Sequence, residues 1–176
     1  METEEQIRFE TVKEVARLML TAARTAPKAK GIDNLVLALA EKSDIDEIAL
    51  KMEEIGTRSG ISSFLRDAGN IRQAQALVLM GTRIKTQGLS VCGRCGVKNC
   101  DEKNLFPDVP CTFNTGDLGI AIGSAVSVAM DHRVDNRIMY TVGQAVLELK
   151  LLGEDVKIAF GIPLSVSPKN PFFDRK

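Results

Sequence analysis

The sequence predicts an α+β fold in which helices surround a small mixed sheet and a cysteine-bearing loop is inserted between them. Three observations support this prediction. Apolar residues recur at helical spacing in five segments. Short apolar runs of strand length lie between those segments. All four cysteines fall in a stretch with loop composition, residues 91–111. No Pro/Gly/Ser-rich linker divides the chain, so we expect a single domain over residues 1–176.

Composition narrows the function classes. The chain has 176 residues, of which 44% are hydrophobic, and its 23 basic and 23 acidic side chains leave no formal net charge. A general binder of nucleic acid or of a membrane surface needs a basic excess, so neither is expected. No apolar stretch is long enough to cross a bilayer. The first five residues are acidic, unlike a secretory signal, and we expect a cytoplasmic location with reduced thiols.

Three helices and two strands are expected before the cysteines, over about 4–24, 35–40, 43–56, 62–75 and 76–81 in chain order. The first helix has apolar residues at helical spacing, and Pro27 ends it or follows its end. Periodicity leaves the short run 35–40 open between a strand and a helical turn, and we favour a strand. Ser43 or Asp44 is suited to cap the next helix. The compact apolar run 76–81 is typical of a buried strand.

Two helices and a third strand are expected after the cysteines, over about 117–129, 134–152 and 155–163. Asp117 is suited to cap the first of these helices. Its glycines, alanines and serines would let neighbouring elements approach closely, so this helix should be central. Gly153 closes the second helix, and Pro163 is expected to stop the strand. The tail holds Phe172 and Phe173 and is expected to pack on a surface, such as that of a partner subunit.

The cysteine spacing is the most specific signal in the chain. The pattern is C-x2-C-x4-C-x10-C, formed by Cys92, Cys95, Cys100 and Cys111. Random placement rarely produces such clustering, so we expect four thiolates that gather around one metal centre. Gly93 and Gly96 would give the backbone the freedom to curl between these ligands.

Two kinds of metal centre fit four cysteines. Structural zinc sites usually take their ligands as two C-x2–4-C pairs. A clustered triplet with a remote fourth ligand favours a [4Fe–4S] cluster. Zinc, a [2Fe–2S] cluster and a redox dithiol remain as alternatives. Arg94, Lys98 and Lys103 lie nearby in the sequence, where they would either offset the negative charge of the centre or serve as solvated loop charges.

Residues 92–100 resemble the C-G-x-C-G-x-x-x-C start of [4Fe–4S] domains in Rnf-type and corrinoid electron-transfer proteins. Over its length the chain is also similar to a prokaryotic family of uncharacterised proteins described as containing a ferredoxin domain. That similarity rests on residues 26–33, the cysteine loop and the stretch from Gly116 to Pro163. No activity, substrate or reaction comes with that family name. Electron transfer, with an unidentified redox partner protein, is what an iron–sulfur cluster on the cysteine loop would provide.

A second similarity is to nitroreductase-type flavoproteins. Residues 22–27 resemble their flavin-approaching loop, and Asp117 with its small-residue helix and residues 161–163 also match. In that fold a homodimer exchanges its termini and binds FMN at the interface. The resemblance therefore implies a homodimer with the phenylalanine-containing tail exchanged. It also implies FMN contacts from Arg24, Lys28, Lys30, Asn34 and Arg175.

Two functions remain open at this point. The first is a redox protein that carries an iron–sulfur cluster, with a flavin and an oxidoreductase activity as further options. The second is a module without redox activity, in which zinc staples a long loop and the protein binds a partner. The cysteines are the metal ligands in both.

Overall fold

The computed structural model describes residues 1–173 of the chain. The helices are α1 (Glu4–Thr25), α2 (Lys42–Ser59), α3 (Ser62–Arg72), α4 (Cys100–Asn104), α5 (Thr112–Asp131) and α6 (Tyr140–Leu149). The strands are β1 (Leu35–Ala40), β2 (Ala76–Arg83), β3 (Asp135–Asn136) and β4 (Val156–Ser165). The α+β prediction is confirmed, and the run 35–40 is a strand.

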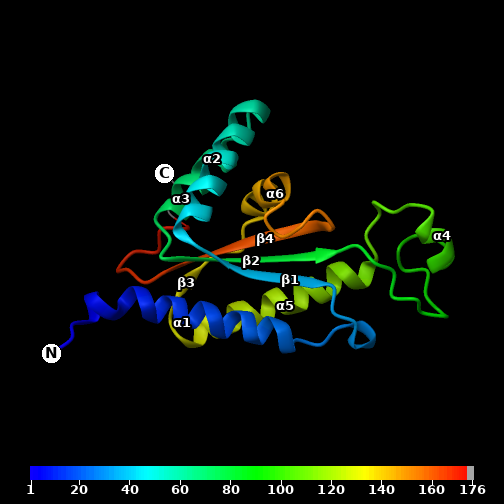
Figure 1. The fold of residues 1–176 in the computed structure, drawn as a ribbon, viewed down its shortest axis with the longest axis horizontal. Coiled ribbons are helices and arrows are strands. Elements are labelled where there is room, and N and C mark those ends of the chain that lie inside the picture. Colours follow the sequence, from blue (N-terminus) through cyan, green and yellow to red (C-terminus); the bar gives the residue numbers. More distant parts are fainter. Residues whose placement is uncertain (174–176) are drawn as a thin grey trace.

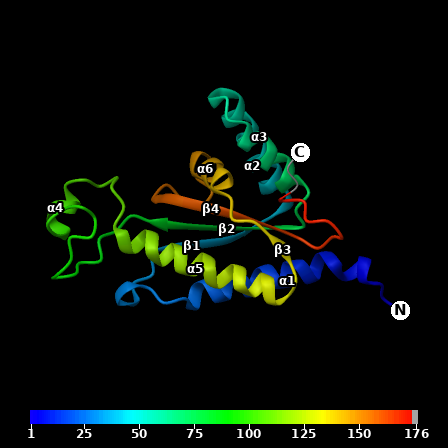
Figure 2. The ribbon, with the colours of Figure 1, turned by 180° about the vertical axis from the view of Figure 1, so that it is seen from behind.

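The four strands form one sheet in the order β1-β2-β4-β3. Each neighbouring pair is antiparallel, where a mixed sheet was expected. Helices α1 and α5 lie against one face, and α2, α3 and α6 cover the other (Figures 1 and 2). The sheet is therefore the middle layer of three, with a hydrophobic core on each side.

Strand β2 shows how the sequence builds both cores. Its residues alternate between the two faces, as a strand period of two requires. Val78 and Met80 enter the core with α1 and α5, whereas Leu77 and Leu79 enter the core with α2, α3 and α6. All four side chains are buried, which explains why this strand reads as one continuous apolar run.

The segment after α5 differs from the expected long helix over 134–152. Residues 135–136 pair with β4 as strand β3, and Met139 forms a bridge with Gly161. Helix α6 begins only at Tyr140. The edge of β4 offers unpaired backbone groups that this segment satisfies, so tertiary pairing overrides its helical pattern.

Pro163 does not stop strand β4, which continues to Ser165. The N–H of Gly161 points toward Met139, with Met139 O as its acceptor at 3.1 Å. Alternate residues direct their N–H groups to the same edge, so the N–H that Pro163 lacks would face residues 137–138. Residues 137–138 lie between strand β3 and the Met139 bridge and are not paired with β4. The proline therefore removes no hydrogen bond of the sheet.

Helix α5 starts five residues earlier than expected, with Cys111 as its N-cap residue. The expectation that its glycines bring neighbouring elements close is not met within residues 1–173. A Cβ added at Gly116, Gly119 or Gly123 would meet no atom within 4 Å. The glycine side of this helix therefore lies open in a single chain.

The tail packs on its own chain as far as Phe173. Phe172 is 1% exposed and joins the core that contains α2, α3 and α6. The Arg137 guanidinium donates to Phe172 O at 2.8 Å and stacks over the ring of Phe173. Within residues 1–173 no helix is both long and apolar enough to cross a membrane.

Candidate metal centre

The cysteines lie on a loop that projects from one end of the molecule. It leaves the sheet at the end of β2, carries the short helix α4, and returns at the start of α5 (Figures 1 and 2). Residues 88–110 are all described, and among them Lys103 alone is buried. The loop therefore has almost no hydrophobic core of its own, so another interaction must stabilise its conformation.

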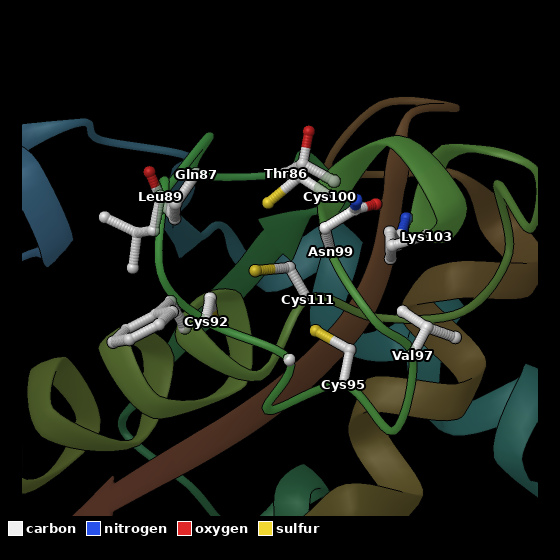
Figure 3. Close-up of a pocket in the computed structure, with 12 residues that line it drawn as sticks. Thr86, Gln87, Leu89, Cys92, Cys95, Val97, Asn99, Cys100, Lys103 and Cys111 are labelled. Carbon is white, nitrogen blue, oxygen red and sulfur yellow. The ribbon is translucent and has the colours of Figure 1, made fainter.

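All four cysteines line one pocket at the base of this loop. The pocket encloses about 300 Å³ of space between atoms, part of it open to solvent. Its walls include apolar side chains of Leu89, Val97 and Phe113. In Figure 3 the side chains of Cys95, Cys100 and Cys111 extend into the space that the loop surrounds. None of the four thiols is in a disulfide.

Two glycines shape the loop around this pocket, as the sequence predicted. Gly93 has φ +100° and Gly96 has φ +82°, both in the left-handed region that favours glycine. Gly96 N–H donates to Gly93 O at 3.2 Å and closes a tight turn around Cys95. This turn directs the second cysteine back toward the start of α5.

Cys95 has the best-defined surroundings of the four thiols. Its Sγ accepts the backbone N–H of Thr112 at 3.3 Å and lies 3.7 Å from the Thr112 hydroxyl. Burial raises the pKa of Cys95, but the hydrogen bonds from Thr112, with contributions from Cys111 and Lys103, outweigh it and leave the pKa below its ordinary value. Thiolate is the form that ligates metals.

Cys111 occupies the N-terminus of the 20-residue helix α5 and is 3% exposed. Its backbone O accepts the N–H of Asn114 at 2.9 Å. The partial positive charge at a helix N-terminus favours an anion, so this position suits a thiolate. The fourth cysteine, remote in sequence, is thus placed at the pocket by the start of a long helix.

The spacing of the four thiols bears on which kind of metal centre the loop could hold. Among residues 1–173, no three His, Cys, Asp or Glu side chains stand close enough to hold one metal ion. Zinc draws four sulfurs to within about 2.3 Å of one point. A [4Fe–4S] cluster instead places an inorganic core between its thiolates, so its ligands stand further apart. The four cysteines share one pocket but form no single-ion site within residues 1–173.

Two further polar side chains line the pocket without protein partners. Gln87 is 2% exposed, and neither its Nε2 nor its Oε1 has a hydrogen-bond partner within residues 1–173. Lys103 is 4% exposed and forms no ion pair with any carboxylate of the described residues. Buried polar groups of this kind normally have partners. Sequence reasoning noted Lys103 only as a nearby charge.

Gln87 and Thr112 were missed by the sequence analysis. Thr112 directly follows a cysteine, and this adjacency is the signal that could have identified it. Gln87 lies five residues before Cys92 in an unremarkable polar stretch, so no pattern in the sequence marks it. Its burial arises because the segment after β2 folds beneath the loop.

The residues that the flavin resemblance implied lie mostly in the loop between α1 and β1. Arg24 pairs with Asp33. Lys28 folds back onto the end of α1, where its Nζ donates to Ala23 O, Arg24 O and Ala26 O at 2.6–2.8 Å. Burial lowers the pKa of Lys28. These two cations are therefore engaged by groups of their own loop.

Lys30 and Asn34 are placed differently. Lys30 Nζ lies 3.2 Å from Gln87 O, so the loop between α1 and β1 contacts the base of the cysteine loop. Asn34 is 7% exposed, and its Nδ2 has no hydrogen-bond partner within residues 1–173. Arg175, the fifth residue implied by the resemblance, lies outside the described residues.

Comparison with known sequences gives two matches. Residues 107–175 match the family described as "Uncharacterized protein containing a ferredoxin domain" (DUF2148). The matched segment contains Cys111 and begins after the other three cysteines. An uncharacterized protein of Archaeoglobus fulgidus is 39% identical over 180 residues, which span 98% of this chain and 96% of that protein.

Solved structures with a similar fold are flavoproteins and nitroreductases. A nitroreductase family protein of Clostridium novyi has a TM-score of 0.60 at 13% identity, and the alignment spans 87% of this chain and 73% of that protein's chain. A putative nitroreductase of Desulfovibrio desulfuricans, solved in complex with FMN, has a TM-score of 0.57 at 14% identity, with coverages of 93% and 78%. A BluB-like flavoprotein of Clostridium difficile reaches 0.55 at 21% identity, with coverages of 89% and 81%. At these identities the likeness establishes a nitroreductase-like fold.

Proposed function

Because this chain belongs to the family of uncharacterized proteins that contain a ferredoxin domain, we propose that it is an electron-transfer protein with a [4Fe–4S] cluster bound by its four cysteines. One observation carries the proposal. Four unpaired thiols of a single projecting loop line the same pocket. Such a cluster supplies one-electron chemistry when it is bound.

The surrounding residues would each perform a definable task. Cys92, Cys95, Cys100 and Cys111 would ligate the cluster. Thr112 N–H, which donates to Cys95 Sγ, would keep that sulfur oriented and partly neutralise its charge. Leu89, Val97 and Phe113 would exclude water from the centre. The projection of the loop would bring the centre close to a redox partner protein.

The ligand assignment predicts which substitution removes the chromophore. Anaerobically purified protein should be brown and contain iron and acid-labile sulfide in equal amounts. The Cys95→Ser variant should lose most or all of its iron and its sulfide. The substitution removes one of the four ligands and the sulfur that accepts the Thr112 hydrogen bond. Iron, sulfide and zinc are assayed on the same sample, with the visible absorption spectrum as a second measure.

His132→Ala is the matched control, since this exposed residue caps the opposite end of α5. It should retain the full iron and sulfide content. A full iron complement in Cys95→Ser would refute the ligand assignment. Stoichiometric zinc without sulfide in the parent protein would establish the zinc-stapled module instead.

The buried amide of Asn34 supports a second cofactor. Similar folds include FMN-dependent proteins, and we propose that the loop between α1 and β1 contributes to an FMN site. Asn34 Nδ2 lacks a partner within residues 1–173, and a flavin ring offers carbonyl acceptors for it. Lys30 joins this loop to the base of the cysteine loop, so the two cofactors would be neighbours.

The open side of α5 supports a homodimer. Between Gly116 and Met130 its exposed residues are all small or apolar, namely Gly116, Gly119, Ile120, Gly123, Ser127 and Met130. Glycine inside a helix costs about 0.5–1 kcal/mol relative to alanine, and nothing within residues 1–173 uses the space. A second copy of the chain, packed α5 against α5, would use it.

A further inference from the structure

Lys103 is buried where a lysine is least expected. It is the one buried residue among residues 88–110, in a loop otherwise exposed or half-buried. Lysine is almost never fully buried unless its charge is paired. No Asp or Glu of residues 1–173 lies within ion-pair distance of it, although Asp101, Glu102 and Asp108 are close in sequence and exposed.

The surroundings of Lys103 indicate what would satisfy its charge. The residue lines the pocket shared by the four cysteines. It is close enough to Cys95 to act on it electrostatically. A buried cation beside four thiolates is compensated by their negative charge, whereas an apolar ligand would leave it unpaired. An anionic group in this pocket would therefore compensate the charge of Lys103.

Gln87 gives an independent observation of the same kind. Its amide is buried in the pocket wall, and both polar atoms lack partners within residues 1–173. A buried amide without hydrogen-bond partners has a free-energy cost, because it has lost its contacts with water. Sulfur atoms of a bound centre would accept its N–H groups and remove most of that cost.

We infer that Lys103 and Gln87 raise the reduction potential of the centre, Lys103 by its charge and Gln87 by a hydrogen bond to sulfur. This inference rests on the proposed cluster. One electron from a low-potential donor adds one negative charge to a group that is already anionic. The Lys103 ammonium at the pocket and the buried amide N–H of Gln87 both stabilise the added charge more than they stabilise the oxidised state. No proton transfer and no bond cleavage are required.

The test measures the reduction potential of the reconstituted protein by dithionite titration with redox mediators, followed by EPR and visible absorption. Lys103→Met should make reduction at least tenfold less favourable, which is about 59 mV for one electron. Gln87→Met should shift the potential in the same direction by a smaller amount. Lys103→Arg keeps the charge and should stay within threefold of the parent.

Lys98→Met is the matched control because it removes the same charge from the same loop at an exposed position. Its effect should remain below threefold, since water screens that charge. Equal shifts in Lys98→Met and Lys103→Met would overturn the inference and leave the proposed cluster intact. Lys103→Met could fail to take up a cluster. In that case the inference is supported if Lys103→Arg takes up the cluster and has the potential of the parent protein, and if Gln87→Met has a lowered potential. A parent protein without iron and sulfide would refute both the inference and the proposed function.

Discussion

Asn34 and Gln87 show how a single buried side chain without hydrogen-bond partners can indicate a ligand site. Both amides are buried, and each holds polar atoms that no group of residues 1–173 satisfies. Asp67, also buried, illustrates the usual case for comparison, since Thr141 donates to it at 2.7 Å. A buried group with a partner stabilises the fold, whereas one without a partner is a candidate for ligand binding.

Asn34→Leu separates these two possibilities. The apoprotein should keep or raise its free energy of unfolding, because the substitution removes an unpartnered buried amide. FMN at a hundredfold excess over its Kd should stabilise the parent by about 2.7 kcal/mol. The same flavin concentration should no longer raise the Tm of Asn34→Leu. Absence of any FMN effect on the parent would rule out the flavin site.

At the scale of elements, α6 and β4 depend on two glycines. A Cβ at Gly143 would lie 1.8 Å from Ala159 O, and one at Gly161 would lie 2.2 Å from Val142. The helix thus rests directly on the strand backbone. This contact fixes the position of α6 against β4, and it completes the core around Phe172.

Gly143→Ala should therefore lower the free energy of unfolding by about 3 kcal/mol, the upper end of the cost of overpacking. Chemical denaturation with circular dichroism measures it. Gly69→Ala is the control, because an added Cβ meets no atom within 4 Å in α3. It should stabilise the protein by about 0.5–1 kcal/mol. Equal stability of the two variants would contradict the close packing of α6.

Local sequence patterns predicted the secondary structure well where the burial of apolar side chains alone determines it. The apolar run of β2 and the spacing of α1 lead directly to a strand and a helix, and the positive φ of Gly93 and Gly96 follows from their places in the cysteine motif. Residues 134–139 could not be predicted, because their strand exists only through pairing with β4. The burial of Gln87 and Lys103 likewise depends on segments that meet only in the folded chain.

At the scale of the whole molecule, the three layers leave one helix side without cover. Ile120 and Met130 on α5 are each more than half exposed, and the glycines between them leave a shallow surface. The opposite layer, with α2, α3 and α6, packs its buried apolar side chains against the sheet and the tail, and its exposed Leu50 and Leu65 are not accompanied by such a row of open glycines. Association through α5 would bury the remaining apolar side without disturbing either core.

Light scattering after size-exclusion chromatography should give twice the monomer mass. Ile120→Glu should yield monomers, because it places a charge at the centre of the proposed contact. Leu50→Glu places the same charge at another exposed aliphatic residue, on α2, and should remain dimeric. A monomeric parent, or a dimeric Ile120→Glu variant, would reject this interface.

The placement of the cysteines outside both hydrophobic layers also bears on durability (Figure 1). Oxygen attacks exposed inorganic centres first, and here the damage would fall on a projection that contributes almost nothing to either core. The body of the protein would outlast the loss of its centre. The same polypeptide could then be recharged with iron and sulfide without passing through the unfolded state.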